Sequence, residues 1–176
     1  MTRRMKLFIT IITLTLAGCG GGGSTDTPAP APVTPAAKTT AVLKIGTQGT
    51  LGAGVSLHGV GVTVTLPTGV TVATDSSGNV GSSAAVVSGV ASGGNIATPV
   101  YKPATATNKA TLKLIVAAAG SGFGTGEFVT VTCNLTAGNS LQASDFPASI
   151  LSNLEPANQS LAPVSGLAPT ITATLN

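Results

Sequence analysis

The sequence predicts an all-β domain, an antiparallel β-sandwich that follows a signal peptide and a disordered linker. Three observations lead to this fold class. Between residues 40 and 175, short runs alternate apolar and polar residues with a period of two. Clusters of Gly, Pro, Asn and Ser separate these runs. No stretch of useful length has helical periodicity, so the runs predict short strands packed as two sheets.

The chain begins with a basic stretch followed by a short apolar run. Arg3, Arg4 and Lys6 precede the apolar residues 7–17, which is the layout of a secretory signal. Eleven helical residues reach roughly 17 Å, well short of the ~30 Å hydrocarbon core of a bilayer. The run therefore cannot span a membrane, and residues 1–18 are predicted to be a signal that is removed.

The end of this run, Leu16 and Ala17, together with the following Gly18 and Cys19, resembles the lipobox of bacterial lipoproteins. The resemblance implies cleavage before Cys19 and attachment of diacylglycerol to its thiol. Two or more acyl chains give stable membrane anchoring without a transmembrane helix. In Gram-negative lipoproteins, Asp after the cysteine favours the inner membrane. Because Gly20 stands there, the resemblance implies an outer-membrane lipoprotein on the periplasmic or extracellular face of the cell envelope.

A neutral domain on a tether follows the anchor. Residues 19–37 are rich in Gly and then alternate with Pro, which predicts an unfolded linker with a reach of up to roughly 55 Å. Eight basic side chains minus the three of the signal leave five, which balance the five acidic ones. This neutral balance gives no support for nucleic-acid binding through a basic surface.

Residues 38–176 have the size of one domain. The clearest strand is 127–135, where Thr130 and Thr132 alternate with apolar neighbours. The stretch 141–154 is mixed, with either a short helical turn or an irregular crossover expected. Turns are expected at 67–69, 75–79 and 120–126. The other expected strands are 40–45, 56–66, 70–73, 110–116 and 170–175.

The order of these runs is similar to that of cohesin-like and carbohydrate-binding-module jelly rolls. An early strand at 40–45 is followed by a long one that leads to Val70, a passage at 86–90, and the strand at 110–116. The Gly-Glu strand that ends in Ala-Gly, residues 125–138, comes next. Cohesins bind dockerin modules through one sheet face, and related domains bind polysaccharide. The resemblance therefore implies a jelly-roll sandwich with a dockerin-like protein or a polysaccharide as partner.

No pattern of residues amounts to a catalytic, metal or cofactor site. Cys133 lies on the apolar side of its strand and is expected to be a buried free thiol, with intermolecular pairing or reactivity as the alternatives. His58, the one histidine, has no nearby carboxylate, so a structural or surface role is expected over a zinc site or a triad. Haem attachment is excluded, because no Cys-x-x-Cys-His occurs.

Acidic and Gly-rich segments have ordinary interpretations. Asp75 is expected to form a plain turn, with a calcium loop as the less favoured alternative. The Gly-rich stretch 120–126 joins strand to strand, so a hairpin loop is favoured over a phosphate loop. Glu127 and Asp145 are the acids that an unrecognised hydrolase would use, and their replacement would then abolish activity without unfolding the domain.

The low aromatic content of the mature domain disfavours a strong sugar-binding face, because such faces commonly stack aromatic rings on sugar rings. The mature domain has no Trp, and Tyr101 and Phe123 are the rings expected to lie on loops where they could contact a ligand. The favoured function is a non-catalytic, membrane-anchored module for protein binding or cell-envelope structure. A polysaccharide-binding module is the alternative, and a hydrolase is the second alternative.

Overall fold

The computed structural model describes residues 37–176, which belong to a compact unit beginning at Pro35. The predicted signal, the predicted lipidation site Cys19 and all but the last residue of the predicted linker lie outside the described residues. Within residues 37–176, no helix is long and apolar enough to cross a bilayer.

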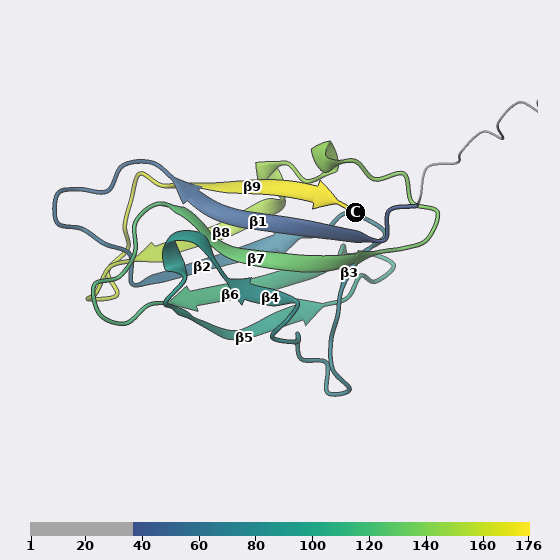
Figure 1. Ribbon diagram of the computed structural model, residues 1–176, viewed down its shortest axis with the longest axis horizontal. Helices are drawn as coiled ribbons and strands as arrows, with labels where there is room; N and C mark the ends of the chain where they lie inside the picture. Colours follow the sequence, from purple (N-terminus) through teal and green to yellow (C-terminus); the bar gives the residue numbers. More distant parts are fainter. Residues whose placement is uncertain (1–36) are drawn as a thin grey trace, which may run out of the picture. The chain divides into compact units, whose positions relative to one another are not determined.

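The domain is a sandwich of two antiparallel sheets (Figure 1), which confirms the predicted all-β fold class. One sheet has the order β3-β7-β1-β9, with β4 also pairing with β7, and the other has the order β5-β6-β2-β8. The strands of the five-stranded sheet are β1 (Thr40–Gln48), β3 (Val70–Val72), β4 (Ala85–Val87), β7 (Gly126–Leu135) and β9 (Ala168–Leu175). Those of the four-stranded sheet are β2 (Gly59–Thr65), β5 (Asn95–Lys102), β6 (Thr111–Ala117) and β8 (Leu151–Ala157).

Alternating side chains build the core between the sheets. On β6, Leu112, Leu114 and Val116 are fully buried, while Lys113 and Ile115 face outward. The same alternation on the other strands fills the space between the sheets with Val, Leu and Ile, as a period of two requires. Each sheet thus has one buried face and one outer face.

The sequence did not predict β4, β5 or β8 as strands. β4 has only three residues. β5 and β8 each carry an internal proline, Pro99 in β5 and Pro156 in β8, and each lies at an edge of its sheet, where a missing N–H is tolerated. The mixed stretch 141–154 contains two 3₁₀ turns, η2 (Ala143–Asp145) and η3 (Ala148–Ile150), and then the beginning of β8. The expected short helical turn is therefore present, beside a strand.

The Gly-rich stretch 120–126 is not a hairpin loop. It connects β6 in one sheet with β7 in the other, so the chain crosses the sandwich there instead of turning back on itself. Within it, Phe123 forms an isolated antiparallel bridge with Leu57. Sequence spacing alone does not distinguish a hairpin from such a crossing.

Candidate functional site

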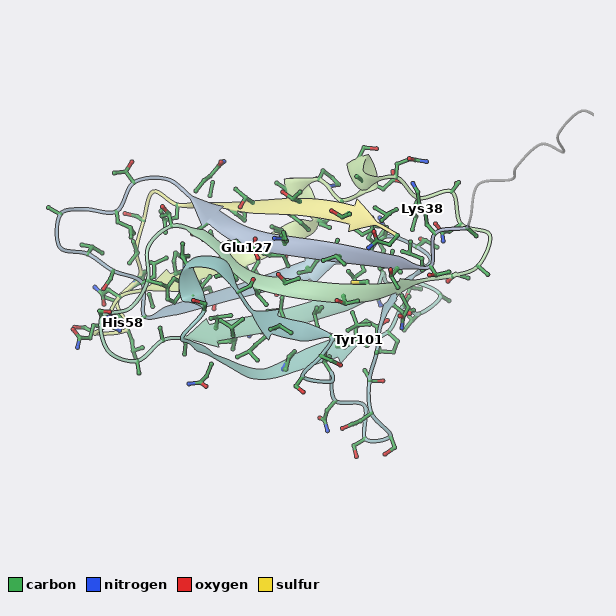
Figure 2. All side chains as sticks on the ribbon, in the orientation of Figure 1. Lys38, His58, Tyr101 and Glu127 are labelled. Carbon is green, nitrogen blue, oxygen red and sulfur yellow. The ribbon has the colours of Figure 1, made fainter. Side chains whose placement is uncertain are left out.

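The two rings predicted to contact a ligand have different environments. Phe123 is only 5% exposed and belongs to the hydrophobic core, so the expectation that its ring is available on a loop is wrong. The physical reason is the pair of backbone hydrogen bonds with Leu57, 2.9 Å each, which hold residue 123 against the core. Tyr101 lies on β5 and not on a loop, and its side chain is half-buried (Figure 2).

Cys133 has the buried surroundings that the sequence predicts. Cys133 is fully buried with a free thiol, and burial raises its pKa to about 12. Such a thiol is a poor nucleophile at neutral pH. His58 is half-buried, and its Nε2 lies 3.2 Å from Oγ of Ser56. Figure 2 shows His58 well separated from Tyr101 and Glu127.

Asp75 forms the predicted turn. Its Oδ1 accepts hydrogen bonds from the backbone N–H groups of Ser77 at 2.8 Å and Asn79 at 2.9 Å. These bonds, led by the one from Asn79, hold the pKa of Asp75 below its ordinary value. The carboxylate is thus used to order its own loop.

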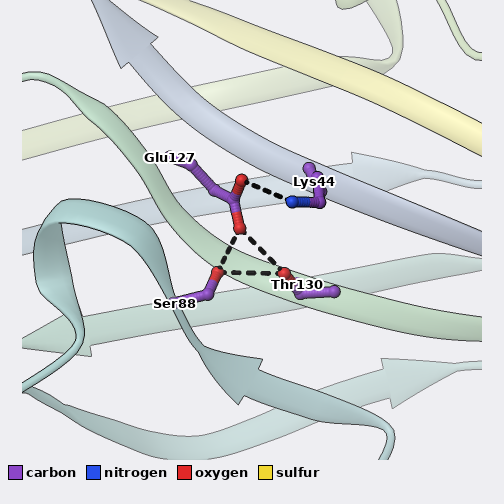
Figure 3. Close-up of polar contacts among 4 residues, drawn as sticks. All are labelled: Lys44, Ser88, Glu127 and Thr130. Carbon is purple, nitrogen blue, oxygen red and sulfur yellow. Dashed lines mark hydrogen bonds and ion pairs between the residues drawn. The ribbon is translucent and has the colours of Figure 1, made fainter.

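Glu127 is the centre of a polar network on the outer face of the five-stranded sheet (Figure 3). Ser88 donates its hydroxyl to Oε1 at 2.6 Å, Thr130 donates to the same oxygen at 3.0 Å, and Nζ of Lys44 lies 3.2 Å from Oε2. The Ser88 hydrogen bond, with smaller contributions from Lys44 and Thr130, lowers the pKa of Glu127. The network joins the segment after β4 to β7 and β1.

These contacts favour a structural role for Glu127. A general acid needs a raised pKa and a general base needs access to substrate, whereas this carboxylate is ionised and held by three neighbours. Asp145 lies elsewhere, in η2, where its Oδ2 accepts the backbone N–H of Gln142 at 2.8 Å. Among residues 37–176, no three His, Cys, Asp or Glu side chains are grouped so as to hold a metal ion.

A cleft of about 490 Å³ lies between the β2–β3 turn and the β5–β6 loop. Tyr101 lines it together with Pro67, Pro103 and Asn108. A second hollow of about 520 Å³ shares Pro67 and Lys109 with the cleft and continues toward η2 and η3. The walls of both hollows are rich in Thr and Ser hydroxyls.

The outer face of the four-stranded sheet carries exposed apolar and charged side chains. We call it the β6 face and define it by the outward residues of β5, β6, β2 and β8. Its register places Val100 beside Lys113, then Thr63 and Ser152. The next row has Ile115 beside Gly61 and Glu155. Its members include Val100, Lys102, Lys113, Ile115, Gly61, Thr63, Glu155 and Ala157.

The β6 face carries two exposed apolar side chains beside three charged ones. Val100 is 49% exposed and Ile115 is 42% exposed, on adjacent strands. Lys102 and Lys113 lie on the β5–β6 side, and Glu155 lies on β8, with its side chain over Gly61. Exposed apolar side chains bordered by charged residues are typical of protein–protein interfaces. The sequence analysis missed this face because β5 and β8, which carry three of these residues, were not predicted.

Searches of protein-family models, curated proteins and solved structures found no match to this chain. The cohesin-like resemblance therefore rests on the residues of this sequence alone.

Proposed function

We propose that this chain is a membrane-anchored, non-catalytic binding module that recognises another protein through the β6 face. Lipid on Cys19 would hold it in the cell envelope, and the linker that follows would let the domain reach a partner away from the membrane surface. An outer-membrane position follows from Gly20 under the same proposal.

The exposure of Val100 and Ile115 carries the proposal. Val100, on the edge strand β5, and Ile115, on the neighbouring β6, remove their apolar area from water only when something covers them. The Glu155 side chain covers the neighbouring Gly61, so it lies directly beside Ile115 on the surface that a partner would contact. The charged residues at the sides would orient that partner.

The test compares two exposed valine or isoleucine positions on opposite sheets. The full chain and its Ile115→Ser and Val86→Ser variants are used to capture proteins from envelope extracts. Val86 is the matched control, since it is 47% exposed on β4 of the other sheet. A partner lost with Ile115→Ser and retained with Val86→Ser supports the proposal. A partner set unaffected by either change contradicts it.

The anchor is tested separately by mass spectrometry of the mature chain. An acylated N-terminal cysteine at position 19 is expected. A mature chain that begins elsewhere, or an unmodified Cys19, would contradict membrane anchoring without touching the β6 face.

A second candidate function is polysaccharide binding in the cleft beside Tyr101. Here the observation is that a half-buried ring shares a wall with hydroxyls and the Asn108 amide, and that a second hollow extends the cleft for a polymeric ligand. Glycan-array binding that is lost in Tyr101→Ala and kept in Ile115→Ser would favour this site. No binding across a broad array would count against it.

A further inference from the structure

We infer that the partner of the β6 face is a second copy of this chain, bound face to face about a two-fold axis. The inference rests on the proposed function, because it takes the β6 face as the binding surface. It is carried by the arrangement of one positive and one negative side chain around the exposed Ile115.

Lys113 and Glu155 have no ionic partner within the described residues, where the one ion pair is Lys44 with Glu127. The register gives their separation. Lys113 lies on β6 opposite Thr63 of β2, and Glu155 lies on β8 opposite Gly61 of β2. They are two strands and two residues apart, so their Cα atoms are roughly 12 Å from each other at ~4.8 Å per strand and ~3.4 Å per residue. At this separation, and with the Glu155 side chain lying over Gly61, the two charged groups are not in contact within one copy.

Two copies of the β6 face can pair these charges. A two-fold axis that lies in the interface, midway between the two residues and perpendicular to the line joining them, places Lys113 of each copy opposite Glu155 of the other. An isologous interface of this kind forms every contact twice. Both Lys–Glu pairs would then be partly desolvated between the sheets, where attraction is stronger than in water.

The same axis brings apolar side chains of the two copies together. On the strand and residue spacings above, Ile115 lies within roughly 2 Å of the axis, so it meets Ile115 of the second copy. Val100 falls near Ala157 of the other β8. Lys102 falls beyond the edge of that strand, where it meets no like charge on the sheet. A single two-fold rotation thus places opposite charges next to each other and apolar side chains next to each other.

The size of the face predicts a weak dimer. Four strands about 4.8 Å apart and seven residues long give a footprint of roughly 450 Å² per copy. Stable interfaces cover about 800 Å² per partner. The association therefore depends on the high local concentration of tethered copies on one membrane.

Cysteine cross-linking in the envelope tests this. The full chain carrying Ile115→Cys is expressed, oxidised mildly and separated on a non-reducing gel. Val86→Cys is the matched control on the other sheet. The chain without an introduced cysteine gives the background, because Cys133 is buried. We expect a dimer band with Ile115→Cys well above the band with Val86→Cys. Equal bands would overturn the inference.

Charge exchange then identifies the partner. In the Ile115→Cys chain, Lys113→Glu or Glu155→Lys alone puts like charges opposite each other twice, and the cross-linked fraction should fall about tenfold. The double exchange restores opposite charges only if the partner is a second copy, so cross-linking should recover. Single variants that lose the dimer, with a double variant that does not regain it, would overturn the inference.

The two proposals can fail separately. If Ile115→Cys does not cross-link but Ile115→Ser still loses a captured protein, then the β6 face binds a different protein and the second-copy inference is wrong. If neither occurs, the β6 face is not a binding surface. Envelope levels of each variant, compared with those of Val86→Cys, show that the exchanged surface charges leave the fold intact.

Discussion

Glu127→Gln is expected to destabilise the domain at neutral pH and to have little effect in acid. In the native protein the carboxylate accepts hydrogen bonds from Ser88 at 2.6 Å and Thr130 at 3.0 Å. Hydrogen bonds to a charged group contribute about 1.5–3 kcal/mol, and a neutral acceptor retains roughly half of that. The ion pair with Lys44 adds little, because the lysine side chain is 56% exposed. The variant should therefore lose about 1–2 kcal/mol of unfolding free energy.

The pH dependence follows from the lowered pKa of Glu127. Because the folded-state pKa lies below the ordinary value of 4.5, the unfolded chain takes up the proton first as pH falls. The stabilisation is complete above about pH 5.5 and is lost as pH falls through 4.5 and below. The difference between the wild-type protein and Glu127→Gln should shrink over the same interval.

Urea unfolding followed by circular dichroism, at pH 7 and pH 3.5, measures this difference in the compact unit, residues 35–176. Glu155→Gln is the control, because Glu155 lies on the β6 face without an ion pair in the described part of the chain, and its replacement should change stability by no more than a few tenths of a kcal/mol. Asp75 also titrates in acid, but it does so in every variant and cancels from the difference. A Glu127→Gln effect that is the same at both pH values would refute the role of the charge.

Three further predictions concern the core and the turns. Thr47→Val should raise the unfolding free energy by about 1 kcal/mol, since Oγ1 of Thr47 is buried without a hydrogen-bond partner among the described residues; a loss of stability in the same urea assay would contradict this. Gly89→Ala should be far more destabilising than Gly78→Ala, because both have positive φ but only at Gly89 would the new Cβ collide with the backbone of Glu127; equal midpoints would show that space is not the deciding factor. Cys133 should react with a thiol reagent only on unfolding, since burial raises its pKa to about 12; labelling of the native domain as fast as that of the urea-unfolded chain would contradict this.

Alternation along the chain was sufficient to predict most of the sandwich. The strands at β1, β2, β3, β6, β7 and β9 all correspond to runs with a period of two, because a half-buried strand places every second side chain in the core. The buried state of Cys133 follows from the same rule. The turn at Asp75 follows from local chemistry, since its side chain bonds to backbone groups two and four residues further on.

Alternation fails at Phe128. A strict period of two would place this ring on the outer face with Thr130, yet it is fully buried. The register skips one residue here, since Ile45 pairs with Val129 and Gly46 with Glu127. The extra residue of this bulge is Phe128. A bulge depends on the partner strand, so sequence periodicity cannot show it.

The candidate sites depended on tertiary structure for a similar reason. Nothing near Glu127 in the sequence shows that Lys44 and Ser88 lie beside it, because strand pairing brings these distant positions together. The β6 face likewise includes β5 and β8, which periodicity did not predict because each strand contains a proline. Phe123 is buried because it forms a bridge to Leu57. By itself, the sequence determined the fold class, because alternation is a local pattern. The membrane address at Cys19 also depends on a local pattern, and it stays a prediction. Only the pairing of strands far apart in the chain decided which side chains share an exposed face.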